Sequence, residues 1–108
     1  RTKENAELRW TATAQELHNQ VRGLSPYPAA WATLQFPGQE PAVFKILATE
    51  LGEPLAPTEA SPLGSLHLVG KAGVEIQTAS GRLRILMLQP AGKKAMPASA
   101  FLNGLRSK

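Results

Sequence analysis

The chain has 108 residues, of which 43% are hydrophobic and 19% are charged, and it contains no cysteine. These values are typical of one globular domain and exclude a disordered chain, a disulfide framework and a thiolate metal site. No apolar run approaches the roughly 18 residues of a membrane-spanning helix, and the N-terminus lacks a signal-peptide pattern.

The formal net charge of +4 is unevenly distributed. Residues 1–59 hold five basic residues and seven glutamates, whereas residues 60–108 hold seven basic residues and a single acidic one, Glu75. A C-terminal half this basic favours a polyanionic partner, most often a nucleic acid.

The first predicted element is a helix that begins after Thr13. Thr13 and Glu16 have the spacing of a capping box, in which each side chain bonds the backbone N–H of the other residue. Apolar residues then recur on one helical face, at Ala14, Leu17, Val21 and Leu24. We predict a helix of about ten residues with Gly23 as its C-cap, ended by the Ser-Pro-Tyr-Pro stretch at 25–28.

Five short strands are predicted after this helix, with no helix between them. Apolar and aromatic runs at 30–36 and 42–49 flank a Pro-Gly turn, and a long loop rich in proline and glycine follows at 52–64. Apolar and polar residues then alternate at 65–69, 74–77 and 82–88. Gly81 can take a positive φ in a turn that joins the last two strands.

A second helix is predicted at the C-terminus from the spacing of Phe101, Leu102 and Leu105. Leu86 and Leu88 predict that the last strand buries both faces toward its end. The fold class is therefore mainly β: a small antiparallel OB-like (Greek-key) β-barrel with an N-terminal helix and a short C-terminal helix.

Residues with catalytic potential are few and carry no motif. His18 lies on the predicted helix and His67 on the polar face of a strand, and no serine has the setting of a nucleophile. The spacing of histidines and carboxylates does not suit a metal, and "GKAG" at 70–73 is too short for a phosphate-binding loop. We predict no catalytic residue and no metal site in this chain.

Two stretches, "ELRWTATAQELHNQVRGLSPYPAAW" and "LQPAGKKAMPASAFLNG", resemble the C-terminal domain of bacterial methionyl-tRNA formyltransferase, as do the strands between them. The similarity is most specific at Gln89 to Met96 and at Arg22, before a proline-aromatic-proline turn. Arg9 departs from the acidic residue that the family usually has there. Pro97 replaces a common serine, and a proline is acceptable at the first helical position.

The resemblance implies a two-domain cytoplasmic bacterial enzyme that transfers a formyl group from 10-formyltetrahydrofolate to the methionine of initiator tRNA. Its catalytic residues and folate pocket would lie in an N-terminal domain, in cis. Residues 1–8 would be the linker from that domain, and residues 9–108 the OB-like tRNA-binding domain. This implies a monomer, with no membrane contact, no metal and no cofactor bound by this domain.

The charge distribution and the resemblance both predict cations that contact phosphates of the tRNA acceptor arm. The strands at 63–89 carry no aromatic residue, which disfavours base stacking and favours recognition of the backbone. Trp31, Phe36 and Phe44 are assigned to the core. The candidate phosphate contacts are Lys93, Lys94, Arg82, Arg84, Lys45, Lys71, Arg106 and Lys3.

Glu75 faces the two strand arginines across the predicted hairpin. We expect it to form an exposed ion pair with Arg82 or Arg84, weak enough for a phosphate to compete. Arg22, beside the apolar helix face, could instead brace the proline turn.

Two other functions are compatible with the sequence. The first is the same domain type in a related formyltransferase or a formyltetrahydrofolate hydrolase or dehydrogenase, where it buttresses the active site without binding RNA. The second is a structural or protein-interaction domain whose basic face serves solubility. Only the tRNA-binding function predicts salt-sensitive affinity for tRNA.

Overall fold

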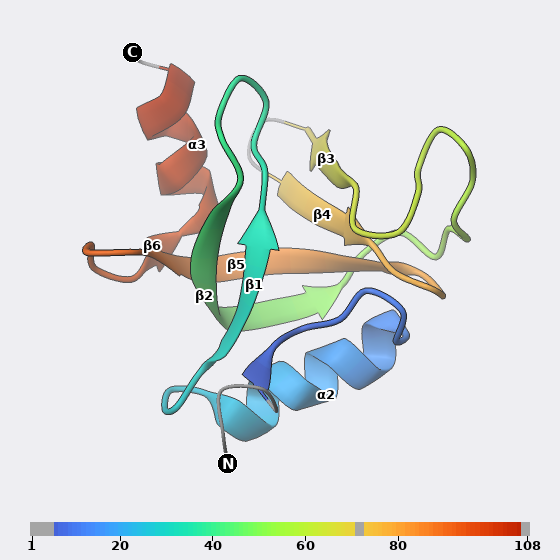
Figure 1. Cartoon of the computed structure of the whole chain (residues 1–108), viewed down its shortest axis with the longest axis horizontal. Helices are drawn as coiled ribbons and strands as arrows, with labels where there is room; N and C mark the ends of the chain where they lie inside the picture. Colours follow the sequence, from blue (N-terminus) through green and yellow to red (C-terminus); the bar gives the residue numbers. More distant parts are fainter. Residues whose placement is uncertain (1–5, 71–72, 107–108) are drawn as a thin grey trace.

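The computed structural model of the protein describes residues 6–70 and 73–106. Figure 1 shows a curved antiparallel sheet with one helix beneath it and a second at its other end. The elements in chain order are α2 (Ala14–Leu24), β1 (Ala30–Leu34), β2 (Ala42–Leu51), β3 (Leu66–Val69), β4 (Gly73–Gln77), β5 (Arg82–Pro90), β6 (Met96–Pro97) and α3 (Ala98–Arg106).

The six strands form one sheet in the order β1-β2-β5-β4-β3, and every pair is antiparallel. The short β6 pairs with Met87 and Leu88, along the edge of β5 that β4 leaves uncovered. Among the described residues no pairing joins β1 to β3, so the sheet is open. The predicted fold class is thus confirmed, with an open curved sheet in place of a closed barrel.

Helix α2 is the element that the sequence predicted most fully. Glu16 N–H donates to Thr13 Oγ1 at 3.1 Å and Thr13 N–H donates to Glu16 Oε1 at 2.9 Å, which completes the capping box. The four predicted apolar residues are all buried. The prediction that Gly23 caps the helix is wrong. Leu24 is fully buried in the last turn, and the C-cap is Ser25, whose N–H donates to the carbonyl of Val21.

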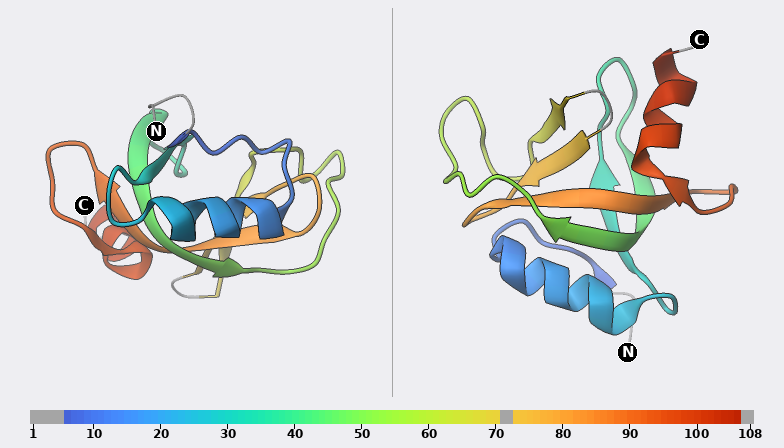
Figure 2. Two further views of the ribbon diagram at one scale, coloured as in Figure 1. Left: turned by 90° about the horizontal axis from the view of Figure 1, so that it is seen from below. Right: turned by 180° about the vertical axis from the view of Figure 1, so that it is seen from behind.

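Two β-bulges change which alternate residues of β2 and β5 face the core. Ile46 lies opposite Leu88 and Thr49 lies opposite Ile85, and between these pairs each strand carries one extra residue, Leu47 in β2 and Leu86 in β5. A bulge bends a strand and shifts its inward-facing set by one. Figure 2 shows this bend of β2. Leu86 is therefore 39% exposed, and the prediction that it is buried is wrong.

The core lies between the sheet and its two helices. Where α3 meets the sheet, the rings of Phe36, Phe44 and Phe101 have centroid separations of 4.8–5.5 Å. Pro97 is the last residue of β6 and precedes α3, so it does not occupy the first helical position. No helix within the described ranges is long and apolar enough to cross a membrane.

The last residues of the predicted linker are packed against the domain. Ala6 and Leu8 are buried in the core cluster, and Leu8 N–H donates to the carbonyl of Trp31 at 2.9 Å. The chain therefore joins the described fold alongside the start of β1.

Candidate nucleic-acid interface

A tight turn at the end of β5 presents two adjacent lysines to solvent. Lys93 N–H donates to the carbonyl of Pro90 at 3.1 Å, and Gly92 takes a φ of +74°, a conformation that favours glycine. The side chain of Gln89 closes the turn from the strand side, because its Nε2 donates to the carbonyl of Lys93 at 2.8 Å. Lys93 and Lys94 are exposed on the segment between β5 and β6, which projects from the sheet in Figure 1.

Lys45 lies next to this turn although it is far away in the sequence. It is exposed on β2, directly opposite Gln89 of β5. A shallow cleft of about 180 Å³ separates it from the turn, lined by Val43, Lys45, Gln89, Pro90, Ala91 and Gly92. We call Lys45, Lys93 and Lys94 the lysine cluster. Within the described part of the chain, no ion pair shorter than 4.0 Å involves these three lysines.

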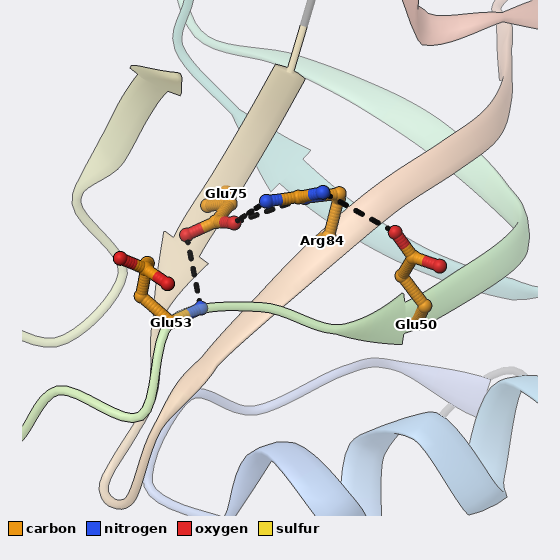
Figure 3. Close-up of polar contacts among 4 residues, drawn as sticks. All are labelled: Glu50, Glu53, Glu75 and Arg84. Atoms are coloured by element: carbon orange, nitrogen blue, oxygen red, sulfur yellow. Dashed lines mark hydrogen bonds and ion pairs between the residues drawn. The ribbon is translucent and has the colours of Figure 1, made fainter. Parts of the chain in front are cut away.

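Arg84 forms a network with two glutamates (Figure 3). Its Nε and Nη2 donate to Glu75 Oε2 at 3.0 and 2.6 Å, and its Nη1 donates to Glu50 Oε2 at 3.3 Å. The hydrogen bond with Glu75 raises the pKa of Arg84; burial opposes this rise, and the charges of both glutamates add to it. The predicted pairing of Glu75 with a strand arginine is confirmed.

The prediction that this ion pair is exposed is wrong, because Glu75 is completely buried. Its second oxygen, Oε1, accepts the backbone N–H of Glu53 at 3.3 Å (Figure 3). The chain at Gly52 passes so close that a Cβ there would lie 2.7 Å from the Glu75 carboxyl carbon. A phosphate that drew Arg84 away would leave a buried carboxylate without its cation, at a large cost. We therefore leave Arg84 out of the proposed interface.

Arg82 is also engaged, at the end of β5 that lies about 26 Å from Pro90. Its Nε donates to Gln77 Oε1 at 3.0 Å and its Nη2 donates to Ser61 Oγ at 3.3 Å. Gln77 is fully buried and donates to the carbonyl of Leu55 at 2.7 Å. Glu75 and Gln77, predicted on a polar strand face, are thus covered because the 52–65 loop folds back over β4.

His67 belongs to this same polar cluster and is hydrogen-bonded to two serines. Its Nε2 lies 2.8 Å from Ser61 Oγ and 2.9 Å from Ser65 Oγ. Ser61 donates its proton to Gln77, and Ser65 donates its proton to the carbonyl of Pro62. Neither serine therefore has a proton left for His67, and we assign the hydrogen shared with the two serines to His67 Nε2. A nitrogen that carries a proton cannot deprotonate Ser61, and the arrangement anchors the loop. Burial and the charge of Arg82 lower the pKa of His67, and Glu75 partly offsets this.

Of the remaining candidate cations, only Arg106 lies within the described residues. Arg106 is exposed in the last turn of α3, about 12 Å along the helix axis from Ala98. Lys3 and Lys71 lie outside the described residues. Arg22 is exposed and its Nη1 donates to Asn19 Oδ1 at 3.4 Å, one helical turn earlier. In the described ranges no three histidine or acidic side chains gather as metal ligands.

Sequence reasoning overlooked one exposed aromatic residue. Tyr27 is 86% exposed between Pro26 and Pro28, in the turn from α2 to β1. The two flanking prolines could have predicted this exposure, because the interior of a helix or a strand does not tolerate two prolines separated by one residue. Trp31, which was assigned to the core, is only partly buried and lies opposite Lys45 in the sheet.

Residues 1–106 match the family model described as formyl transferase, C-terminal domain. The chain belongs to the formyl transferase C-terminal domain family. It is 40% identical over 102 residues to the methionyl-tRNA formyltransferase of Porphyromonas gingivalis, and 43% identical over 99 residues to that of Hydrogenovibrio crunogenus. These alignments cover 94% and 92% of this chain but 31% and 29% of the relatives. The chain thus spans about a third of the length of the curated relatives it matches.

The same domain fold occurs in HypX from Aquifex aeolicus. A HypX structure superposes with a TM-score of 0.72 over 99% of this chain and 18% of HypX, at 17% sequence identity. This likeness shows a shared fold.

Proposed function

We propose that this chain is the tRNA-positioning C-terminal domain of a bacterial methionyl-tRNA formyltransferase. The longer enzyme would transfer a formyl group from 10-formyltetrahydrofolate to the methionine of initiator tRNA in the cytoplasm. In this proposal the folate and the catalytic residues belong to the preceding domain, and this domain contributes a surface for RNA. Its family and its identity of about 40% to methionyl-tRNA formyltransferases support the assignment.

The observation that carries the RNA-binding part is that Lys45 lines a cleft whose opposite wall, Pro90 to Gly92, leads directly into Lys93 and Lys94. A lysine ammonium is a point charge with three donors, which suits a phosphate oxygen without reading a base. The floor of the cleft is partly apolar, from Val43, Pro90 and Ala91, so a sugar could lie on it while its phosphates contact the lysines. Since three contacts are few, we expect weak affinity, with a Kd of about 10⁻⁴–10⁻⁶ M.

The test is tRNA binding by this 108-residue chain across a series of salt concentrations. For a phosphate contact, log K falls by roughly 0.7–0.9 for each unit of log salt concentration. We expect a slope of about −2 to −3 for the wild type, and the Lys93→Ala/Lys94→Ala variant should flatten it by about one to two units.

A matched control removes two positive charges elsewhere on the surface. Arg9 and Arg22 are both exposed and lie outside the lysine cluster, so Arg9→Ala/Arg22→Ala should leave the salt slope nearly unchanged. If the salt slope flattened equally in both double variants, tRNA binding would depend only on the net charge of the domain. If the wild type has no affinity at low salt, the basic half is ordinary surface and the domain only braces its neighbour, as in related formyl enzymes that do not bind RNA.

A further inference from the structure

We propose that the turn at residues 25–29, which we call the Tyr27 turn, is the surface on which the preceding domain of the longer protein docks, with the Tyr27 ring at the centre of the contact. This inference rests on the proposed function, which supplies the preceding domain.

Tyr27 is unusual in its exposure. It is 86% exposed, whereas the other exposed large hydrophobic residues are between 39% and 51% exposed. Tyrosine supplies a large contact area at little cost in conformational entropy, and it is enriched among the residues that dominate binding energy at interfaces. A ring held this far out of the domain is therefore a suitable anchor for a protein partner.

The Tyr27 turn is fixed by the elements on both sides of it. Ser25 N–H donates to the carbonyl of Val21 at 2.9 Å, and Ala29 N–H donates to the carbonyl of Leu24 at 3.0 Å. Two prolines restrict φ within the turn. Ala29 has a φ of +77°, which residues other than glycine rarely adopt, although it is buried. Backbone outliers of this kind persist where the surroundings determine them, and they concentrate at functional surfaces.

The chain enters the described fold close to this turn. Glu7 pairs with Trp31 at the start of β1, and Gln20 Nε2 donates to the carbonyl of Glu7 at 3.2 Å. Tyr27 lies four residues before Trp31, a span of at most about 14 Å, and adjacent strands lie about 5 Å apart. The Tyr27 turn is thus within about 20 Å of the entering segment, and Figures 1 and 2 show both at the same end of α2.

The length of the relatives indicates what covers this surface. The chain matches a C-terminal domain and spans 31% of a methionyl-tRNA formyltransferase, so about two thirds of such an enzyme precedes it. A domain that continues into Ala6 has its attachment point beside β1. A standard interface of about 800 Å² on each partner would easily include a turn at this distance.

The location also has a consequence for the RNA. Trp31 lies opposite Lys45, and Lys45 lies opposite Gln89 at the base of the turn that carries Lys93 and Lys94. One strand spacing therefore separates the start of β1 from Lys45, and two spacings, about 10 Å, separate it from Gln89 of β5. A domain docked on the Tyr27 turn would lie beside RNA held by the lysine cluster. We favour docking over base stacking for Tyr27 because the entering segment approaches this turn.

The test places a photoreactive p-benzoylphenylalanine at position 27 of the full-length protein. Illumination should join residue 27 to peptides that precede residue 1, identified by mass spectrometry. The matched control carries the same residue at position 68, because Leu68 is 41% exposed on β3, the other edge strand of the sheet. We expect at least tenfold more intramolecular product from position 27, roughly the effect of one interface anchor.

Three outcomes would overturn the proposal: equal yields from the two positions, a product with a second copy of the protein, or a product with added tRNA in place of the preceding domain. A second measurement follows protease cleavage between the domains, which should be about tenfold faster in Tyr27→Ala and unchanged in Tyr27→Phe. Equal cleavage rates in Tyr27→Ala and the wild type would also reject docking. Failure of salt-sensitive tRNA binding would reject the proposed function while leaving the crosslink result intact.

Discussion

Removing the guanidinium that neutralises the buried Glu75 carboxylate should cost this domain a large part of its stability. In Arg84→Met, Glu75 loses its contacts at 2.6 and 3.0 Å and keeps only the longer hydrogen bond from Glu53 N–H. Loss of one partner from a buried ion pair costs about 3–5 kcal/mol. The Arg84 side chain is 34% exposed, so water already screens part of the pair, and we expect a loss of about 3 kcal/mol.

That loss is large beside the total, because a domain of this size is stable by about 5–15 kcal/mol. The assay is urea unfolding followed by circular dichroism, which gives the free energy of unfolding and its denaturant slope. The Glu75→Leu/Arg84→Met variant is the matched control: it removes both charges, and we expect it to recover most of the lost stability. The reasoning is refuted if Arg84→Met unfolds within about 1 kcal/mol of the wild type, or if the double variant is no more stable than the single one.

Two further predictions concern the same region. Gly52→Ala should lower the free energy of unfolding by about 1–3 kcal/mol, because its Cβ would lie 2.7 Å from the Glu75 carboxyl carbon, which is held in place by Arg84. Its control, Gly23→Ala, has open space in a helix and should gain about 0.5–1 kcal/mol; equal effects would contradict the argument. The folded-state pKa of His67 lies below 6.5, so its neutral form stabilises the fold above that pH, and the stability is lost as the pH falls through the lowered pKa. The melting temperature should therefore fall less from about pH 7.5 to about pH 5 in His67→Gln than in the wild type, and parallel curves would exclude this role for His67.

Local patterns in the sequence predicted the elements, because the interactions that define them are themselves local. Thr13 and Glu16 are three residues apart, and their reciprocal hydrogen bonds need nothing else from the chain. The hairpin turn was equally accessible: Gly81 has a φ of +78°, and Thr78 N–H donates to its carbonyl at 3.1 Å.

The alternation of apolar and polar residues along a strand predicted burial correctly only where one face of the sheet is open to solvent. Glu75 and Gln77 have the sequence signature of outward-facing residues, but the loop at 52–65 covers them, and no period in β4 reports what a distant loop does. The bulge residues Leu47 and Leu86 are likewise invisible to a period-2 pattern, because each is an extra residue that only the strand pairing reveals.

The candidate site was predicted in part for a similar reason. Lys93 and Lys94 were found from their position in a turn, which is local information. Their proximity to Lys45 depends on the register of β2 against β5, which fixes Lys45 opposite Gln89. The engagement of Arg82 and Arg84 with buried partners depends on the same tertiary arrangement, so the sequence alone counted them as available cations.

The paired bulges of β2 and β5 set a rule for building chimeras from related domains. The register before Leu47 and Leu86 is the same as the register after them, because one extra residue in each strand cancels the other. A grafted β2 that lacked the extra residue, paired with an untouched β5, would place the side chains beyond the missing bulge on the opposite face of the sheet. Both strands must therefore carry their extra residue or both must lack it, even though about 40 residues separate Leu47 from Leu86 in the chain.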